Sequence, residues 1–335
     1  MSILVSINCI TYNHEKYIAN AIEGFLMQET NFKYEIIIGE DCSTDNTRNI
    51  IENYIKEYPG RIKLITSSNN VGARRNSRRV FKESKGKYIA ICEGDDYWTD
   101  KHKLQKQVDY MEKNEQCNLV FHNVGYLNNS TKKIKYNQIL EEKKYYLEDI
   151  VLNSGGFIPT ASILYRKELM ENPPEWYMKA SVGDYPLQIL SGLNGYVYCI
   201  SDIMALYRIN VEGSWSSNQL KNLNKEKLLN KEINVIKILN DFNKYTDSKY
   251  IDLVNKAKIQ YEYRVDLLNK NMKLKDIKRS KYNEYYENLS KKEKFESFLA
   301  LESTCLYIFY LKSEFYFKRS IKKVIGNLKN GFFKE

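Results

Sequence analysis

Three short polar segments hold most of the side chains of this 335-residue chain that could take part in chemistry. They are residues 11–14 (TYNH), 40–45 (EDCSTD) and 93–98 (EGDDYW), and each follows a run of mainly apolar residues. Taken singly, such segments are as often caps and turns as binding sites. If the apolar runs are neighbouring parallel strands, however, the three segments meet in one crevice, because parallel sheets bind ligands beyond the carboxyl ends of their strands.

The adjacent carboxylates of Asp95 and Asp96 are the strongest chemical signal. They follow the apolar run 88–92, which predicts that both lie at the end of a buried strand. Two carboxylates held together away from water repel each other and lose hydration, which is costly unless a cation or hydrogen-bond donors compensate. Mg²⁺ or Mn²⁺ would compensate, since such ions take oxygen ligands and keep positions for water and phosphate oxygens. Gly94 permits close approach of backbone and ligand. The alternative, an acidic surface turn, is disfavoured by the apolar run.

Alternating strands and helices would position these segments. Apolar, β-branched runs predict strands, and apolar residues spaced by three and four predict helices between them. The expected strands are residues 3–10, 34–39, 61–66, 87–92 and 118–126, and the expected helices are residues 15–28 and 45–58. This order predicts an α/β fold with a Rossmann-like, mostly parallel sheet that is covered by helices on both faces.

The charge balance of the chain changes near residue 216. Residues 1–215 contain 26 Lys and Arg against 27 Asp and Glu, whereas residues 216–335 contain 26 against 15. No proline follows Pro186, and no glycine lies between residues 213 and 326, which favours helix. Apolar residues at helical spacing predict one buried helix face, formed by Leu229, Ile233, Ile236, Leu239 and Phe242. We therefore expect an α/β catalytic domain at 1–215 and a basic α-helical domain at 216–335.

Several classes of protein are disfavoured. The first residues, MSILVSINCITYN, lack a basic leader and a cleavage site, and no apolar run reaches the ~18 residues that span a bilayer. The six cysteines form no CxxC pair and have no histidine at ligand spacing, so neither a disulfide framework nor a zinc site is expected. Three lie inside apolar runs, where thiols are usually buried: Cys9, Cys92 and Cys199. We expect a cytoplasmic protein that does not bind nucleic acid, because the first part carries no basic excess.

Six segments in order along the chain form a recognisable set. They are TYNHEKYI, EDCSTDNT, NNVGARRN, GKYIAICEGDDYW, VGDYPLQI and YRINVEGSWS. This set resembles the family 2 glycosyltransferases of the GT-A fold. The resemblance covers residues 3 to about 216, EGDDYW is its most specific part, and residues 217–335 resemble no family that we can name. It implies an enzyme that uses a UDP-sugar as co-substrate and Mn²⁺ or Mg²⁺ as cofactor.

The resemblance also implies a nucleotide pocket at the ends of the first two strands. Three consecutive residues would line it, partly through backbone groups: Thr11, Tyr12 and Asn13. Asp41 would hydrogen-bond the base, normally uracil, and Glu40 would stand beside it. His14 lies in the same loop with either a functional or a structural role, whereas His102 and His122 are expected to be structural.

The diphosphate and the metal would be held by later segments. By the resemblance, Asp96 is the metal ligand that bridges to the diphosphate, and Asp95 faces the ribose or the base. The segment 70–76, with Arg74 and Arg75, would lie near the phosphates or the donor sugar.

Arg208 and Trp215 belong to the segment that, in the family, closes over the donor. The family often has a histidine just after its Tyr-Arg pair, and here that position is Asn210. An amide oxygen is a weaker ligand than a carboxylate, so the metal affinity is expected to be modest. Asp96 would then be the one strong protein ligand.

Asp184 matches the catalytic base of the family. An acceptor hydroxyl has a very high pKa and needs a carboxylate to take its proton, while a cation stabilises the leaving diphosphate. We expect one inverting transfer of a hexose, of glucose or N-acetylglucosamine type, to a hydroxyl of a surface glycan or of a protein serine or threonine. Thr160 and Ser162 lie where a wall of the acceptor site is expected, although the glycines and proline before them also fit a loop that closes onto a strand.

Two other functions stay open. A metal-dependent nucleotidyl transferase would also use paired aspartates, but the sequence lacks GxxxxGK[ST] and GxGxxG turns, and Asp184 would have no task. A non-catalytic or regulatory GT-A scaffold is the second. The complete set of carboxylates argues against it: Asp41, Asp95, Asp96 and Asp184.

The C-terminal part suggests a partner surface. Residues 317–328 predict an amphipathic helix, with basic residues around it: Lys318, Arg319, Lys322, Lys323 and Lys329. Such a face can rest on anionic lipid headgroups as a peripheral membrane contact, or dock on the catalytic domain or a protein acceptor. Solvated lysines on a packed helix are the commoner case. The tyrosine-rich stretch 261–286 contains no motif for nucleic acid.

Overall fold

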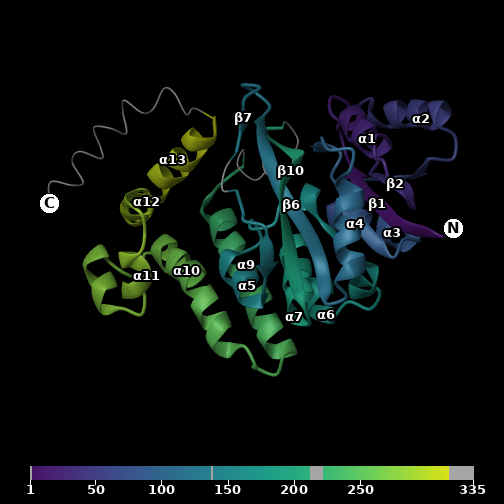
Figure 1. The fold of residues 1–335 in the computed structure, drawn as a ribbon. Coiled ribbons are helices and arrows are strands. Elements are labelled where there is room, and N and C mark those ends of the chain that lie inside the picture. The colour runs from purple at the N-terminus through teal and green to yellow at the C-terminus, as the bar shows by residue number, and fades with distance from the viewer. Residues whose placement is uncertain (1, 137–138, 212–221, 317–335) are drawn as a thin grey trace. The chain divides into compact units, whose positions relative to one another are not determined.

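A computed structural model of the chain describes residues 2–136, 139–211 and 222–316 (Figure 1). The chain divides into two compact units, Met1–Gly213 and Ser214–Glu335. The first unit combines a large sheet with helices, and the described residues of the second form helices joined by turns, with no strand among them. The predicted α/β fold class, with additional C-terminal helices, is therefore confirmed.

One sheet organises the first unit, with the strand order β3-β2-β1-β4-β9-β6-β10-β5. Four neighbouring strands run parallel: β1 (Ile3–Thr11), β2 (Lys33–Glu40), β3 (Ile62–Ile65) and β4 (Tyr88–Ile91). A second parallel pair consists of β6 (Cys117–Asn128) and β10 (Tyr196–Ile209). Four short antiparallel strands complete the sheet: β5 (Tyr97–Trp98), β7 (Ile134–Lys135), β8 (Lys143–Tyr145) and β9 (Leu164–Arg166).

The order of the first four strands creates a crevice. The chain steps from β1 to β2 to β3 in one direction and then returns past β1 to β4. Since such crossovers are right-handed, α1 (Ile18–Leu26) and α2 (Thr47–Glu57) cover one face, and α3 (Ala73–Glu83) covers the other. The direction reverses between β1 and β4, and the carboxyl ends of strands at such a reversal form ligand sites.

Four further helices belong to the first unit: α4 (Lys103–Lys113), α5 (Leu147–Asn153), α6 (Glu175–Lys179) and α7 (Asp184–Leu193). Of these, α4, α5 and α7 contact the second half of the sheet or one another, and α6 is hydrogen-bonded to α3 (Figure 1). The core contains alternate residues of β1, including Cys9, as well as Trp98 and Phe25, whose rings lie 5.0 Å apart edge to face. Cys92 and Cys199 are also fully buried and free, as predicted for thiols in apolar runs.

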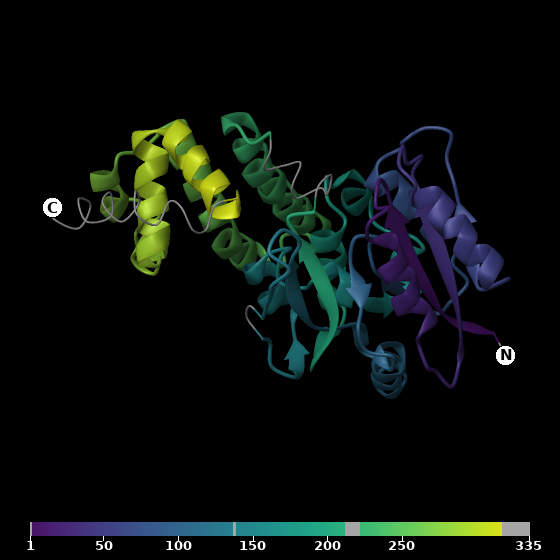
Figure 2. The same ribbon diagram turned by 90° about the horizontal axis from the view of Figure 1, so that it is seen from above.

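The second unit consists of short helices and two long ones. They are α9 (Lys225–Tyr245), α10 (Ile251–Asn269), α11 (Asn283–Glu287), α12 (Lys291–Glu302) and α13 (Thr304–Tyr316). The helices α12 and α13, drawn in yellow, lie side by side in Figure 2. No helix in the described part of the chain is long and apolar enough to cross a bilayer. The predicted helix at 317–328 lies outside the described residues.

The predicted apolar face of α9 needs correction. Ile233 is 47% exposed, whereas the buried side of the helix includes Leu228, Leu239 and Phe242. Glu232 is buried on that same side, because its Oε2 accepts hydrogen bonds from Nε (2.9 Å) and Nη2 (2.8 Å) of Arg264. The apolar spacing predicted the helix correctly. It did not predict the buried face, which includes Glu232 because this residue forms an ion pair with Arg264.

Candidate active site

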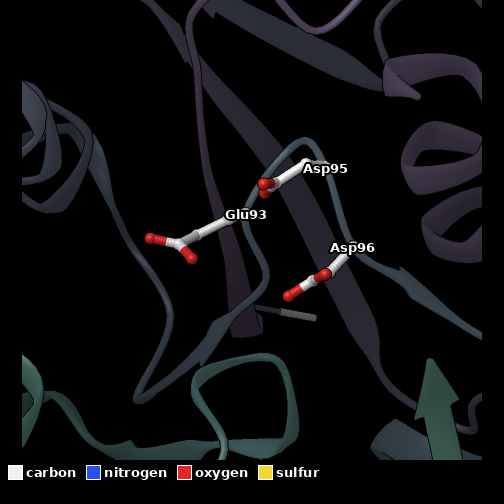
Figure 3. A group of neighbouring side chains, drawn as sticks. All are labelled: Glu93, Asp95 and Asp96. Carbon is white, nitrogen blue, oxygen red and sulfur yellow. The ribbon is translucent and has the colours of Figure 1, made fainter. Parts of the chain in front are cut away.

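Three carboxylates gather on the loop between β4 and β5 (Figure 3). One oxygen of each of Glu93, Asp95 and Asp96 lies within 4.8 Å of the others. Asp96 is almost fully buried, and the other two side chains are partly exposed. The loop follows β4, so it lies at the reversal point of the sheet, where the topology places a ligand crevice.

Gly94 fixes this acidic loop against the end of β1. Its N–H donates to the carbonyl of Ile10 at 3.0 Å. A Cβ at this position would lie 2.6 Å from Oγ1 of Thr11 and 3.0 Å from Nδ1 of His14. A side chain there would push the acidic loop away from β1. Glycine is therefore needed here for packing against β1. We had predicted only that it lets a ligand approach the backbone.

Arg208, at the end of β10, holds the acidic loop from the other side. Its main-chain N–H donates to Oδ1 of Asp96 at 2.7 Å. Its guanidinium donates through Nη1 to the carbonyl of Asp95 at 2.6 Å and through Nη2 to Oδ1 of Asn20 at 2.7 Å. The residue is only 7% exposed and stacks over the rings of Tyr17 and Tyr97. In this structure Arg208 is therefore a support of the acidic loop.

The acidic loop favours bound protons or a cation. Burial, and then the charge of Asp95, raises the pKa of Asp96 well above the usual range. Burial, followed by the charges of Asp95 and Asp184, raises the pKa of Glu93 to about 8. Like charges in a poorly solvated place have this effect, and a divalent ion would relieve it.

The donor atoms suit a hard divalent ion. Carboxylate oxygens are the preferred ligands of Mg²⁺ and Mn²⁺. Asn210 lies two residues beyond Arg208, and its Oδ1 is buried with no hydrogen-bond partner among the described residues. Buried polar atoms normally have partners, and none of the described residues supplies one here. The carboxylates of Glu93, Asp95 and Asp96 therefore fit the predicted metal, and whether Asn210 adds a ligand stays a prediction.

The predicted nucleotide loop packs tightly against its neighbour. Asn13 has a φ of 56°, and its Oδ1 accepts from the main-chain N–H of Thr44 at 2.8 Å. Glu40 is fully buried and accepts from the N–H of Ser43. Thr11 is buried, whereas Tyr12 is 37% exposed and is thus the member of the loop most open to a ligand.

Asp41 shapes the loop that follows β3. Its Oδ1 accepts from the N–H of Val71, and its Oδ2 accepts from the N–H of Gly72, both at 2.9 Å. Ser67 donates a further hydrogen bond at 3.2 Å. The carboxylate lies at the carboxyl end of β2, beside β1, where the nucleotide is expected. Its predicted contact with a base stays a prediction.

His14 joins three parts of the site, a role that the sequence left undecided. Its Nδ1 lies 3.2 Å from Oγ1 of Thr11, and its Nε2 lies 3.9 Å from Oδ2 of Asp95. Its main-chain N–H donates to Oγ1 of Thr47, at the start of α2, at 2.8 Å. Burial lowers the pKa of this histidine. The signal in the sequence was its place directly after Thr11–Asn13.

Asp184 is the first residue of α7, and its charge acts on Glu93 of the acidic loop. Its Oδ1 accepts from the N–H of Tyr185 at 2.8 Å, and burial raises its pKa. The charge of Asp184 contributes to the raised pKa of Glu93, after burial and the charge of Asp95. The predicted base therefore lies near Glu93 of the acidic loop, and its catalytic role stays a prediction.

Arg74 is the cation near Asp184. It lowers the pKa of Asp184, although burial has the larger and opposite effect. Its Nη2 donates to the carbonyl of Tyr177 at 2.6 Å, and its guanidinium lies 4.7 Å from the ring of that residue. Arg75, which we predicted for phosphate binding, is exposed on α3. Its role stays a prediction.

Two further predictions have different outcomes. Trp215 lies outside the described residues. Ser162 is fully buried, and its hydroxyl donates to the carbonyl of Pro159 at 2.6 Å, so it is not available to an acceptor and that prediction was wrong. The 3₁₀ turn Thr160–Ser162 instead closes onto β9, the alternative that the sequence had left open.

Known proteins share the motifs and the fold of this site. The model of the family described as Glycosyl transferase family 2 matches residues 6–172, which include the acidic loop. The chain belongs to glycosyltransferase family 2. The prediction of this family from the six ordered segments is confirmed.

Relatives of this glycosyltransferase match its first unit. An uncharacterized protein of Mycobacterium tuberculosis is 34% identical over 220 residues, which are 64% of this chain and 61% of that protein. The chain therefore matches about three fifths of the length of this relative. In Escherichia coli, the UDP-Glc:alpha-D-GlcNAc-diphosphoundecaprenol beta-1,3-glucosyltransferase WfgD is 29% identical over 231 residues, which are 67% of this chain and 83% of WfgD.

Solved structures show the same fold. S. aureus TarS 1–349 in complex with UDP-GlcNAc has a TM-score of 0.55 at 18% identity and matches 91% of this chain and 82% of its own. The mannosyltransferase PcManGT from Pyrobaculum calidifontis, in complex with GDP-Man and Mn²⁺, has a TM-score of 0.53 at 10% identity and matches 95% of this chain and 89% of its own. At these identities the likeness supports the GT-A fold alone.

Proposed function

We propose that this family 2 member transfers a hexose from a UDP-sugar to a hydroxyl acceptor, with inversion at the anomeric carbon. One observation carries the proposal. The acidic loop lies at the reversal point of the sheet, and the charge of Asp184, which is 88 or more residues away in sequence, raises the pKa of Glu93 in that loop. A metal-assisted displacement needs these two groups, one for the leaving diphosphate and one for the proton of the acceptor.

The acidic loop would hold the diphosphate end of the donor. Asp96 would be the main ligand of Mn²⁺ or Mg²⁺, with Asp95, Glu93 and Asn210 as further oxygen ligands. When bound, the ion supplies positive charge for the leaving diphosphate. Arg208 keeps Asp96 in place through its N–H, which leaves Oδ2 of the carboxylate for a ligand. The raised pKa values of the loop support this role, because a cation restores the charged form of each carboxylate.

Asp184 would act as the general base. It would accept the proton of the acceptor hydroxyl as the new glycosidic bond forms and the bond to UDP breaks. Burial raises its pKa and so makes the carboxylate a better proton acceptor, while the charge of Arg74 acts in the opposite direction. Attack from the side opposite the leaving group gives inversion.

The identity of the donor rests on relatives. WfgD is named as an enzyme that uses UDP-Glc, and TarS was solved with UDP-GlcNAc. They support a UDP-hexose of glucose or N-acetylglucosamine type. Glycan synthesis fits the acceptor named for WfgD, and a protein serine or threonine is the second acceptor class that we predicted. The basic second unit would help to present the acceptor. Peripheral contact with a membrane is one way in which it would do so. A cytoplasmic location stays a prediction.

The test is UDP release by the full chain. Purified protein is incubated with UDP-glucose, UDP-N-acetylglucosamine, UDP-galactose and GDP-mannose, each with MnCl₂, MgCl₂ or EDTA. We expect slow release of UDP from at least one UDP-hexose with a divalent ion, no release in EDTA, and a product of inverted anomeric configuration by NMR. No release from any donor, or a retained configuration, would contradict the proposal.

A further inference from the structure

A cavity of about 230 Å³ lies between β6 and the segment 153–159. Two aromatic residues, Tyr126 and Phe157, and two amides, Asn123 and Asn153, form much of its lining, together with Gly156 and Pro159. None of its described lining residues carries a charge. The groups that the site uses for the nucleotide and the metal do not contribute to this cavity.

The walls of the cavity connect it to Asp184 and Asp96. Gln188 lies one helical turn after Asp184 on α7, and its Nε2 donates to the carbonyls of Gly155 and Ile158 at 3.3 Å each. The helix that begins with the base therefore holds the segment that forms one wall. On the other wall, Tyr126 of β6 pairs with Tyr207 of β10, the residue before Arg208, whose N–H donates to Asp96. The cavity thus adjoins both halves of the site.

The lining is rigid before any ligand binds. Phe157 packs edge to face against Phe121 (ring centroids 5.9 Å apart) and Tyr145 (5.2 Å). Asn123 donates through Nδ2 to the carbonyl of Leu140 and accepts from the N–H of the same residue. The side chain of Asn153 is fixed by a hydrogen bond from Nδ2 to the carbonyl of Asp149 at 2.8 Å. A preformed wall loses little entropy on binding.

We propose that this cavity binds one uncharged sugar residue of a glycan acceptor. Resting on the function proposed above, this inference selects the acceptor class. A pyranose presents C–H faces to aromatic rings and hydroxyls to amides and phenols. The lining offers the rings of Tyr126 and Phe157, the phenol of Tyr126 and the amide of Asn153, whereas both N–H groups of Asn123 already donate within the protein. A uronate or sugar phosphate would lose hydration here without a countercharge. An extended peptide would need a longer groove than 230 Å³ provides.

Gly156 gives a way to fill the cavity without disturbing the fold. It is exposed at the wall, its φ is not positive, and a Cβ there would meet no atom within 4 Å. Gly156→Leu should therefore fold normally and take up space that the sugar needs. Gly156→Ala adds only one methyl group and serves as the graded control. Asn153→Leu, at an exposed position, removes a polar group of the wall and is the second variant.

The experiment compares acceptors by the UDP that they release above donor hydrolysis. The probes are p-nitrophenyl β-glucoside, p-nitrophenyl β-N-acetylglucosaminide, p-nitrophenyl β-glucuronide and a serine- and threonine-containing peptide. We expect a neutral glycoside to stimulate UDP release and Gly156→Leu to reduce that stimulation by about tenfold or more, equivalent to ~1.4 kcal/mol. Donor hydrolysis, UDP affinity and Tm should stay as in the wild type, and Gly156→Ala should have a smaller effect.

The outcomes separate this inference from the proposed function. If the wild-type protein hydrolyses a UDP-sugar but prefers the glucuronide or the peptide, the inference is wrong and the proposed function stands. The same holds if no neutral glycoside stimulates release, or if Gly156→Leu and Asn153→Leu respond to it as the wild type does. If the wild type releases UDP from no donor, the proposed function itself fails.

Discussion

The main-chain N–H of Arg208 donates a 2.7 Å hydrogen bond to Oδ1 of Asp96, which joins two residues 112 positions apart. The bond connects the end of β10 to the loop after β4. The second half of the domain therefore orients the carboxylate that we propose as the metal ligand. The guanidinium of Arg208 adds hydrogen bonds to the carbonyl of Asp95 and to Asn20.

Replacing Arg208 by lysine should loosen the acidic loop. A lysine ammonium has no planar fork and cannot reproduce both side-chain hydrogen bonds in the same geometry. We expect Arg208→Lys to weaken Mn²⁺-dependent UDP binding by about tenfold and to lower the free energy of unfolding by ~1–3 kcal/mol. Calorimetric titration and urea unfolding measure the two effects. Arg48→Lys, at an exposed pair with Glu52, is the control and should change neither; equal effects in both variants would contradict this role.

The rate of transfer should depend on the ionisation of Asp184. Burial raises its pKa, so the carboxyl keeps its proton to a higher pH than an ordinary aspartate near ~3.9. The base works only when ionised, and activity should therefore fall as the pH drops through this raised pKa. Because Arg74 lowers the pKa of Asp184, Arg74→Gln should move the acid limb of the kcat/KM profile to higher pH. If the acid limb of the kcat/KM profile is the same in Arg74→Gln and the wild type, Arg74 does not influence the ionisation of the base.

Removing the carboxylate of Asp184 should stop transfer while sparing the donor site. Asp184→Asn keeps an oxygen that can accept from the N–H of Tyr185. We expect kcat to fall by about 10²- to 10⁴-fold, the usual contribution of a general base. UDP affinity by calorimetry should change less than about twofold, well below the ~1.4 kcal/mol that a tenfold change represents. A parallel loss of binding and transfer would show that Asp184 is not the base.

Gly94 should not tolerate a methyl group. A Cβ would approach Oγ1 of Thr11 to 2.6 Å, so Gly94→Ala must shift the acidic loop or the end of β1. We expect a loss of ~1–3 kcal/mol in stability, together with weaker stabilisation by UDP and Mn²⁺ in thermal unfolding. Gly156→Ala, which meets no atom within 4 Å, is the control for stability. Equal Tm values for Gly94→Ala and Gly156→Ala would show that the acidic loop accommodates a methyl group at residue 94, against this prediction.

Lys103 should destabilise the protein near neutral pH. It is fully buried against the ring of Trp98, and burial lowers its pKa to about 7. From pH ~7 to ~10.4 the unfolded chain binds one more proton than the folded protein, so the free energy of unfolding rises with pH across this window. We expect Lys103→Met to be more stable than the wild type at pH 7, by about 2–4 kcal/mol, and the difference to vanish near pH 10.

Urea unfolding at several pH values measures this effect. Lys101→Met, at an exposed pair with Glu29, is the matched control and should show no such trend. If Lys103→Met instead destabilises the protein equally at every pH, the ammonium is charged in the folded state. Its contacts with Gln107 and Trp98 would then outweigh burial.

Much of the first half of the fold could be predicted from sequence. The apolar run at 3–10 became β1, which extends one residue further at its end, and the run at 34–39 became β2, which extends one residue further at both ends. Such runs are predictable because a buried parallel strand is continuously apolar. The place of Asp95 and Asp96 followed, since they come directly after β4. By contrast, β9 has three residues, too few for any periodicity, and its antiparallel pairing depends on distant neighbours.

The site was predictable in its residue types and less so in its contacts. The role of Arg208 depends on the register of β10, which no local pattern encodes. Lys103 was not predicted as buried because lysines are usually exposed. Arg74 and Arg75 could not be told apart without the rotation of α3, which turns only the first toward Tyr177. Tertiary packing decides each of these cases.

The central claim is that Asp96 holds a divalent ion against the diphosphate, and calorimetric titration of UDP with and without MnCl₂ tests it most directly. Asp96→Asn keeps an oxygen for the N–H of Arg208 and loses the charge; Asp109→Asn, on the exposed side of α4, is the control. The account predicts that Mn²⁺ tightens UDP binding by about tenfold or more in the wild type and in Asp109→Asn, and not in Asp96→Asn. The account is contradicted if Mn²⁺ leaves the UDP affinity of the wild type unchanged. It is also contradicted if Mn²⁺ raises the UDP affinity of Asp96→Asn as much as that of the wild type.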